Sequence, residues 1–252
     1  IILKGVKKQI KKQILSLHTI LVWSKNMRQI VLIFLIVVPI ASCSVNPVTG
    51  QRDFTLLSVD EEVSIGEKNF APARQAKGGD YHVDLELQRY VRDVGLKWAA
   101  VADNRQLPYE FVVLNNPVPN AWVLPGGKVA INRGLLLYLR DEAQLAAVLA
   151  HEIVHAAARH GAIQITRGSY MQFGSSVLSA QTEGNIYKSY ADLVTSIGAA
   201  AWMARYGRSD ELEADLYGMR YMARAGYEPV AAVELQQTFL ALAGNTDTEG
   251  SW

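Results

Sequence analysis

The chain has 252 residues, of which 50% are hydrophobic and 19% charged, and its formal net charge is +1. This length and composition suit one folded core of about 200 residues and give no sign of disorder. The near-neutral charge gives no argument for nucleic acid as a partner. The single cysteine excludes an intramolecular disulfide framework and a cysteine-rich zinc site.

The first segment of the chain indicates export followed by lipidation. Residues 28–43 run from one basic residue through about a dozen apolar residues to a small-residue site, which is typical of a secretory signal. The apolar run is short for a membrane span. Ile40-Ala41-Ser42-Cys43 resembles a bacterial lipobox, so we predict lipidation at Cys43, with an ordinary signal peptide or an uncleaved anchor as the alternatives. Ser44 at the next position favours sorting to the outer membrane.

This pattern divides the chain into four parts. We expect residues 1–26 to be an upstream or non-native extension, residues 27–42 a lipoprotein signal peptide and residues 43–58 a turn-rich tether. Residues 59–252 are then one folded domain.

The spacing of apolar residues predicts the elements of this domain. Apolar residues at intervals of three and four predict helices over residues 59–75 and 83–101. The β-branched run at 110–115 predicts a strand. Residues 121–132 predict a β-hairpin that turns at Pro125-Gly126-Gly127, and the proline favours a position at the sheet edge. A short helix over 133–139 follows.

Residues 162–206 are rich in small side chains, and we expect broken helices around Gly184-Asn185. This segment is interpreted as a mobile cover, as a membrane-facing surface or as ordinary helix packing.

The centre of the chain carries a metal-binding pattern. Residues 141–161 predict a helix that contains His151, Glu152 and His155, and positions i and i+4 of a helix share one face. Both imidazoles can therefore bind one zinc ion, and Glu152 lies beside them to take the proton of a zinc-bound water. Apart from Glu152 the segment 143–158 has no charged residue and no proline, which suits a buried helix. Unpaired histidines and a carboxylate would be costly there, and a metal accounts for them.

Local signals predict where this helix begins and ends. Asp141 with Gln144 has the spacing of a capping box, and Gly161 is a suitable end. His160 misses the third-ligand position of metzincins by one residue, so we expect it to cap the C-terminus of the helix instead.

A downstream acidic helix offers a third ligand. In residues 209–225, Glu211 and Asp215 are four positions apart and share a face, whereas Glu213 is turned about 200° from Glu211. With Asp210 as N-cap, Glu213 completes a capping box. This leaves Glu211 as the candidate ligand and Asp215 as the acceptor for the free ring nitrogen of a zinc-bound histidine. A solvated acidic helix start is the alternative interpretation.

Taken together, these motifs resemble the M48 peptidases, gluzincins that include the CAAX prenyl endopeptidase, the HtpX membrane protease and a bacterial lipoprotein branch with BepA. The motifs that carry the resemblance are His151-Glu152-x-x-His155 with Arg159-His160, Glu211-x-x-Ala214-Asp215-x-x-Gly218, Asn120-Ala121-Trp122-x-x-Pro125-Gly126-Gly127 and Asn46-Pro47-Val48-Thr49-Gly50. The similarity extends from about Cys43 to Gly244.

The resemblance implies a mainly α-helical α+β fold, with a gluzincin core and a small β-sheet beside the histidine helix. It implies zinc ligands at His151, His155 and Glu211, a catalytic Glu152, a supporting Asp215 and a role in degrading misfolded envelope proteins. The end of the chain departs from the family pattern, because no histidine follows His160 where lipoprotein members usually carry a regulatory one. We therefore expect a C-terminal truncation, and no tetratricopeptide repeat is visible.

We predict a zinc endopeptidase of the bacterial cell envelope with one Zn²⁺ per chain, anchored by lipid at Cys43 on the periplasmic face of the outer membrane. Its polypeptide substrates would lie along the edge strand formed by Asn120, Ala121, Trp122 and Val123. Tyr206 and Arg208 are candidates for stabilising the oxyanion. Two alternatives stay open: a non-catalytic zinc lipoprotein that binds unfolded proteins, and a zinc hydrolase that acts on other bonds.

Overall fold

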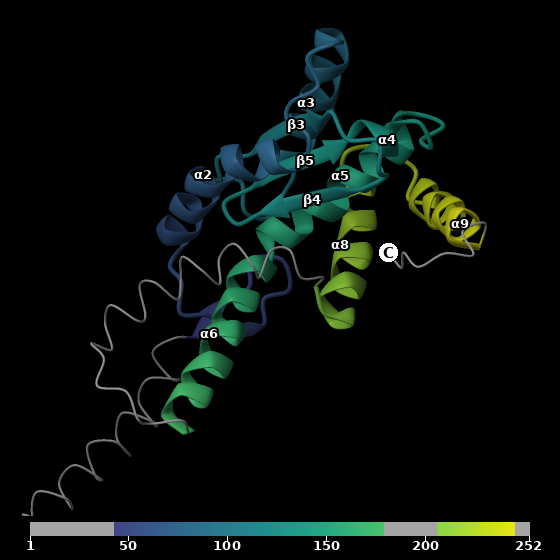
Figure 1. Cartoon of the computed structure of the whole chain (residues 1–252). Helices are drawn as coiled ribbons and strands as arrows, with labels where there is room; N and C mark the ends of the chain where they lie inside the picture. Colours follow the sequence, from purple (N-terminus) through teal and green to yellow (C-terminus); the bar gives the residue numbers. More distant parts are fainter. Residues whose placement is uncertain (1–42, 179–205, 245–252) are drawn as a thin grey trace, which may run out of the picture. The chain divides into compact units, whose positions relative to one another are not determined.

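The computed structural model describes residues 43–178 and 206–244 (Figure 1). Ser44–Trp252 form one compact unit, and only Cys43 is described of the unit that precedes it. The predicted extension, the signal peptide and the break at Gly184-Asn185 lie outside the described residues. Within the two described ranges, no helix has the length and apolarity needed to cross a membrane.

A three-stranded sheet lies at the centre of the described fold. It consists of β3 (Glu110–Leu114), β4 (Ala121–Leu124) and β5 (Lys128–Asn132), in the order β3-β5-β4. β4 and β5 form the predicted hairpin and pair antiparallel, whereas β3 pairs parallel to β5. β4 is therefore an edge strand of this sheet, as its flanking proline predicts.

Helices cover both faces of the sheet. Helix α2 (Val59–Ala76) packs through Phe70 onto Val112 and Leu114, and α3 (Leu85–Ala99) and α5 (Glu142–Ala157) share the main core with Phe111 and Val113. Successive side chains of β3 alternate between the two faces, as the pleat of a strand requires. All five residues of β5 are buried because this central strand is covered on both sides.

Side chains fix the start of each of these helices. Ser58 caps α2 and forms a reciprocal capping box with Glu61, and Asp84 caps α3. The carboxylate of Asp141 accepts a hydrogen bond from the Gln144 backbone at the start of α5. The Gln144 side chain bonds to the Arg140 backbone and not to Asp141, so only half of the predicted capping box forms. Helix α4 (Arg133–Leu136) is shorter than the predicted helix over 133–139.

The end of α5 differs from the sequence prediction. The helix ends at Ala157, and α6 (His160–Leu178) begins three residues later, so Gly161 is not the stop and His160 does not cap α5. The chain turns at Arg159, which has a φ of 64°. This left-handed conformation costs a non-glycine residue about 1–2 kcal/mol. The Arg159 guanidinium offsets that cost by donating to the Glu62 carboxylate and the Leu57 carbonyl.

Two C-terminal helices pack against α5, as Figure 1 shows for α8. They are α8 (Arg208–Arg224) and α9 (Val230–Gly244). The predicted N-cap of α8 at Asp210 is wrong, because the Gly207 carbonyl accepts hydrogen bonds from the backbones of Asp210 and Glu211 and Gly207 is the cap.

Residues 43–58 form more structure than the predicted tether. Strands β1 (Cys43–Val45) and β2 (Arg52–Phe54) pair with each other, and Asn46, Val48, Thr55 and Leu57 are buried. The described part of the chain is therefore mainly helical with two small sheets, which confirms the predicted α+β class.

Candidate metal centre

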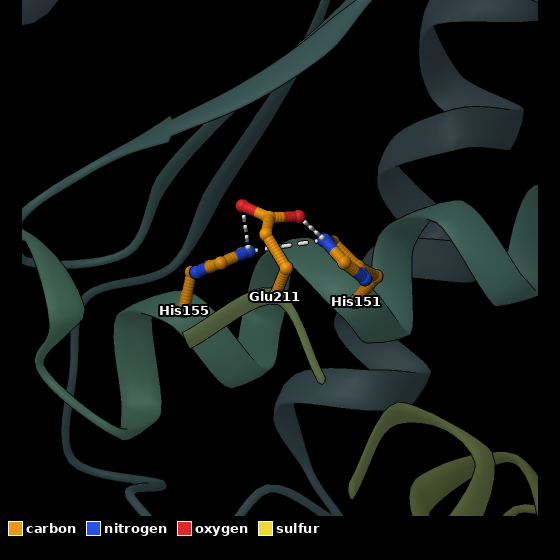
Figure 2. A group of neighbouring side chains, drawn as sticks. All are labelled: His151, His155 and Glu211. Carbon is orange, nitrogen blue, oxygen red and sulfur yellow. Dashed lines mark hydrogen bonds and ion pairs between the residues drawn. The ribbon is translucent and has the colours of Figure 1, made fainter. Parts of the chain in front are cut away.

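Three side chains from two helices converge on one point. His151 and His155 lie one turn apart on α5, with their Nε2 atoms 3.0 Å apart. Glu211 reaches them from α8, with one carboxylate oxygen 3.4 Å from the His151 Nε2 and the other 3.7 Å from the His155 Nε2 (Figure 2). The three ligand atoms all lie within 4.8 Å of one another.

Small residues on α8 allow this approach. Ala214 and Gly218 are buried, and a Cβ placed on Gly218 would lie 3.4 Å from the His151 backbone nitrogen. Asp215 also faces α5, and its carboxylate lies 2.9 Å from the His151 Nδ1. The structure thus places Glu211 and Asp215 on the face of α8 that their spacing predicts. The capping box expected for Glu213 is wrong, because Gly207 and not Asp210 caps α8, but the turn of about 200° between Glu213 and Glu211 does keep Glu213 out of the cluster.

The donor set fits zinc. Two imidazole nitrogens and one carboxylate are ligands that zinc takes in catalytic sites, with a fourth position left open. Ligand atoms about 2.1 Å from one tetrahedral ion lie about 3.4 Å apart, and the spacings of 3.0 to 3.7 Å in this cluster are close to that value. The His155 side chain is 2% exposed and that of Glu211 is 44% exposed, so the cluster is closed on one side and open on the other.

The charges of the cluster favour a cation. Burial lowers the pKa of His151, but hydrogen bonds to Asp215 and Glu211 outweigh burial and raise that pKa to about 10. Burial together with the neighbouring His151 and His160 lowers the pKa of His155. The carboxylates of Asp215 and Glu211 therefore favour positive charge beside His151, which suits a metal cation.

Glu152 lies beside the cluster and is buried. Burial raises the pKa of Glu152 to about 7, an effect that His151 opposes and Glu211 reinforces. A carboxyl group with a pKa near neutrality is suited to accept and return a proton at physiological pH.

The cluster opens into a cavity of about 1130 Å³. His151, Glu152, His155 and Glu211 line it together with the edge-strand residues 120–123. The structure therefore brings the predicted edge strand to the same cavity as the candidate metal ligands. Apolar side chains of α8 and α9 also line the cavity, among them Met219, Met222, Leu235 and Phe239.

Tyr206 and Arg208, the two candidates for oxyanion stabilisation, have different surroundings. The Tyr206 ring stacks on the His155 ring, with centroids 4.0 Å apart and an angle of 14° between the planes. Its hydroxyl lies 3.7 Å from the position of a Cβ on Gly161. Tyr206 is therefore a packing partner of a ligand histidine, a contact that the sequence did not indicate. Arg208 lines the cavity beside Glu211.

Sequence reasoning also missed contacts behind His155. The Nδ1 of His155 lies 2.9 Å from the Nδ1 of His160, and the Nε2 of His160 lies 3.2 Å from Glu213. The sequence patterns instead predict helix-capping roles for His160 and Glu213. The one feature of the sequence that pointed to His160 was its place, directly after Arg159, in the motif that carries the family resemblance.

Comparisons with known proteins agree with this centre. The sequence model of peptidase family M48 matches residues 85–246, which include the whole cluster. The chain is 31% identical over 204 residues to the mitochondrial metalloendopeptidase OMA1 of Schizosaccharomyces pombe, covering 79% of this chain and 58% of that protein. It is 29% identical over 180 residues to OMA1 of Arabidopsis thaliana, covering 71% of this chain and 36% of that protein.

A bacterial relative matches to a similar degree. The chain is 29% identical over 195 residues to the beta-barrel assembly-enhancing protease of Escherichia coli, covering 73% of this chain and 39% of that protein. The chain thus spans between 36% and 58% of the lengths of these three relatives. The family model covers well over half of the chain, and the chain belongs to peptidase family M48, a family of zinc metallopeptidases.

Proposed function

We propose that this protein is a zinc-dependent endopeptidase in which His151, His155 and Glu211 bind the metal and Glu152 is the catalytic base. The observation that carries the proposal is the convergence of Glu211 on the two imidazoles. This convergence lies at a cavity that an edge strand lines. A purely structural zinc site would not need a buried carboxyl group beside an open cavity.

The residues of the site have separable roles. Zinc, when bound, acts as a Lewis acid that lowers the pKa of water and polarises the scissile carbonyl. Glu152 accepts the proton of the attacking water and passes it to the leaving amine. Asp215 accepts the Nδ1 hydrogen of His151 and so keeps the lone pair of Nε2 directed at the metal.

β4 is the element best placed to hold the substrate. Within the described sheet β4 is the edge strand that pairs with β5, and an edge strand beside an active site can align an extended peptide by main-chain hydrogen bonds. Such a peptide would lie along residues 120–123, which line the same cavity as Glu152. Main-chain hydrogen bonds of this kind align a polypeptide without demanding a particular sequence.

We further propose that the protein acts on misfolded proteins in the bacterial cell envelope and is anchored there by a lipid on Cys43. The lipobox pattern at 40–43 and the similarity to a beta-barrel assembly-enhancing protease support this location. The mitochondrial relatives show that membership of the family does not by itself determine the compartment. Labelling with a lipid precursor tests the anchor: we expect incorporation in the natural sequence and none in Cys43→Ser.

Cleavage of unfolded casein by the purified protein tests the enzyme. We expect a chelator to stop cleavage and added zinc to restore it. Glu152→Gln should retain zinc but lower kcat by about 100- to 10,000-fold, the usual contribution of a general base. Glu67→Gln makes the same chemical change at an exposed position and should leave the activity unchanged.

Other outcomes would exclude particular parts of the proposal. A Glu152→Gln protein with full activity would remove the general base. A zinc-loaded wild-type protein that binds casein without cleaving it would indicate the non-catalytic alternative.

A further inference from the structure

A chain of hydrogen bonds extends from one ligand histidine into the interior of the protein. From the Nδ1 of His155 it continues over 2.9 Å to the Nδ1 of His160. The Nε2 of His160 continues it over 3.2 Å to the Glu213 carboxylate. The side-chain amide of Asn46 donates to the same carboxylate oxygen, also over 3.2 Å, and to Asp53 over 2.9 Å.

The chemistry of the groups fixes the direction of each of these bonds, given the metal site proposed above. A neutral imidazole that binds zinc through Nε2 carries its hydrogen on Nδ1, so His155 donates to His160. The Nδ1 of His160 is then an acceptor, and its Nε2 carries the hydrogen that Glu213 accepts. Carboxylates can only accept, so Asn46 must present its amide hydrogens to Glu213 and Asp53.

We call this chain of His155, His160, Glu213 and Asn46 the relay; protein encloses its two imidazoles and the Asn46 amide, whereas the Glu213 side chain is partly exposed. His155 and His160 are each 2% exposed, and Asn46 is 3% exposed. Because water has little access there, a hydrogen-bonding group that lost its partner would remain unpaired. The orientation of His155 therefore depends on the outer residues of the relay.

The two ligand histidines are supported in different ways. His151 contacts its carboxylate, Asp215, directly. The Nδ1 of His155 is instead connected to the Glu213 carboxylate through His160, so a second imidazole lies between this ligand histidine and its supporting carboxylate. We propose that His160 and Glu213 are positioning residues that hold His155 in its zinc-binding tautomer and orientation, and that Asn46 connects the segment 43–58 to the metal centre through Glu213.

Asn46 is well suited to this connection. Its side-chain oxygen accepts hydrogen bonds from the Val48 and Thr49 backbones, which closes the turn between β1 and β2. One amide group thus holds the turn with its oxygen and the carboxylate of Glu213 with its nitrogen. The motif Asn46-Pro47-Val48-Thr49-Gly50 therefore contributes to the geometry of the metal site as well as to the local turn.

Zinc affinity, measured by competition with a chromophoric chelator, tests the relay. His160→Leu removes the acceptor for the His155 Nδ1 hydrogen and should weaken zinc binding by about 10- to 100-fold. His160→Asn places an amide oxygen near the position of the imidazole Nδ1 and should recover part of that loss. Glu213→Gln removes the charge at the end of the relay and should weaken binding less than His160→Leu.

A second measurement reports on His155 directly. The visible absorption of the Co²⁺-substituted protein depends on the arrangement of the ligands, so it should change in His160→Leu and Asn46→Asp. Asn46→Asp keeps the oxygen that closes the turn but places a negative charge against Glu213. If His160→Leu fails to fold, the zinc affinity and Co²⁺ spectrum of Glu213→Gln test the relay instead. The Glu213 side chain is partly exposed, so this variant should fold.

The matched control is Thr166→Val. Thr166 is buried and anchors the same N-terminal segment through the Leu56 backbone, but it has no bond to the relay. It should lower the melting temperature and leave the zinc affinity and the Co²⁺ spectrum unchanged.

The outcomes separate this inference from the proposed function. Wild-type zinc affinity and an unchanged Co²⁺ spectrum in both His160→Leu and Glu213→Gln would overturn the relay while the zinc site stands. Wild-type affinity in His151→Ala would overturn the zinc site itself.

Discussion

Gly218 lies where α8 packs against α5, the two helices that carry the candidate metal ligands. A Cβ at this position would lie 3.4 Å from the His151 nitrogen, 3.5 Å from its Cα and 3.6 Å from the Ala150 carbonyl carbon, all ordinary contacts. Gly218→Ala therefore fits without moving α8. Alanine favours a helix interior over glycine by up to about 1 kcal/mol, so the variant should melt about 2–4 °C higher and keep its zinc affinity.

For Gly218→Val we expect the opposite effect on stability. Its two methyl groups would extend about 1.5 Å beyond the Cβ, into the backbone of α5, and helix geometry limits valine largely to one rotamer. Overpacking of this kind costs about 1–3 kcal/mol. Relief requires α8 to move away from His151, and this movement also withdraws Glu211, which lies two helical turns earlier on the same face. We expect a lower melting temperature and weaker zinc binding.

Differential scanning calorimetry and chelator competition on the two variants test the packing argument together. A Gly218→Ala protein destabilised by more than about 1 kcal/mol, against the gain expected from helix propensity, would contradict the contact distances. So would a Gly218→Val protein that binds zinc as tightly as the wild type.

Two further predictions concern stability away from the metal. Glu62→Leu leaves Arg159 buried without its partner carboxylate, because the Glu62 and Arg159 side chains are only 2% and 8% exposed. The free energy of unfolding, measured in urea, should fall by about 3–5 kcal/mol. Glu67→Leu at an exposed position should change it by less than about 0.5 kcal/mol, and equal effects of the two variants would refute the buried pair. Hydrogen bonds from Tyr227 and Tyr90 hold the pKa of Glu142 below its usual value. Because the folded state lowers this pKa, the stabilisation is present at neutral pH and is lost as the pH falls through the lowered pKa. Glu142→Gln should therefore melt below the wild type at pH 7 and converge with it at acid pH, once the pH has fallen below the lowered pKa of Glu142. A constant difference would show that the charge of Glu142 is not involved.

Local sequence patterns predicted the parts of this protein that depend on local geometry. The i, i+4 spacing on α5 put His151 and His155 on one face, and the same spacing on α8 did so for Glu211 and Asp215. Pro125 correctly indicated an edge strand. Each of these conclusions needs only helical or strand periodicity.

The predictions that failed concern one helix start and two contacts between distant residues. Gly207 caps α8 through its backbone carbonyl alone, without the side-chain acceptor that the prediction for Asp210 required. Arg159 adopts a left-handed conformation, which local rules would assign to Gly161 instead. Its hydrogen-bond partners Glu62 and Leu57 lie about a hundred residues away, so no local pattern shows them. The pairing of His160 with Glu213 is likewise a tertiary contact. Capping rules cannot anticipate it.

The division of the ligands between α5 and α8 has a consequence for synthesis. A ribosome completes His151 and His155 well before it reaches Glu211, and a chain at that stage offers zinc two imidazoles and no anionic third ligand. Tight metal binding then requires α8 to be made and docked on α5. A nascent or partly unfolded copy would therefore lack the complete set of candidate ligands.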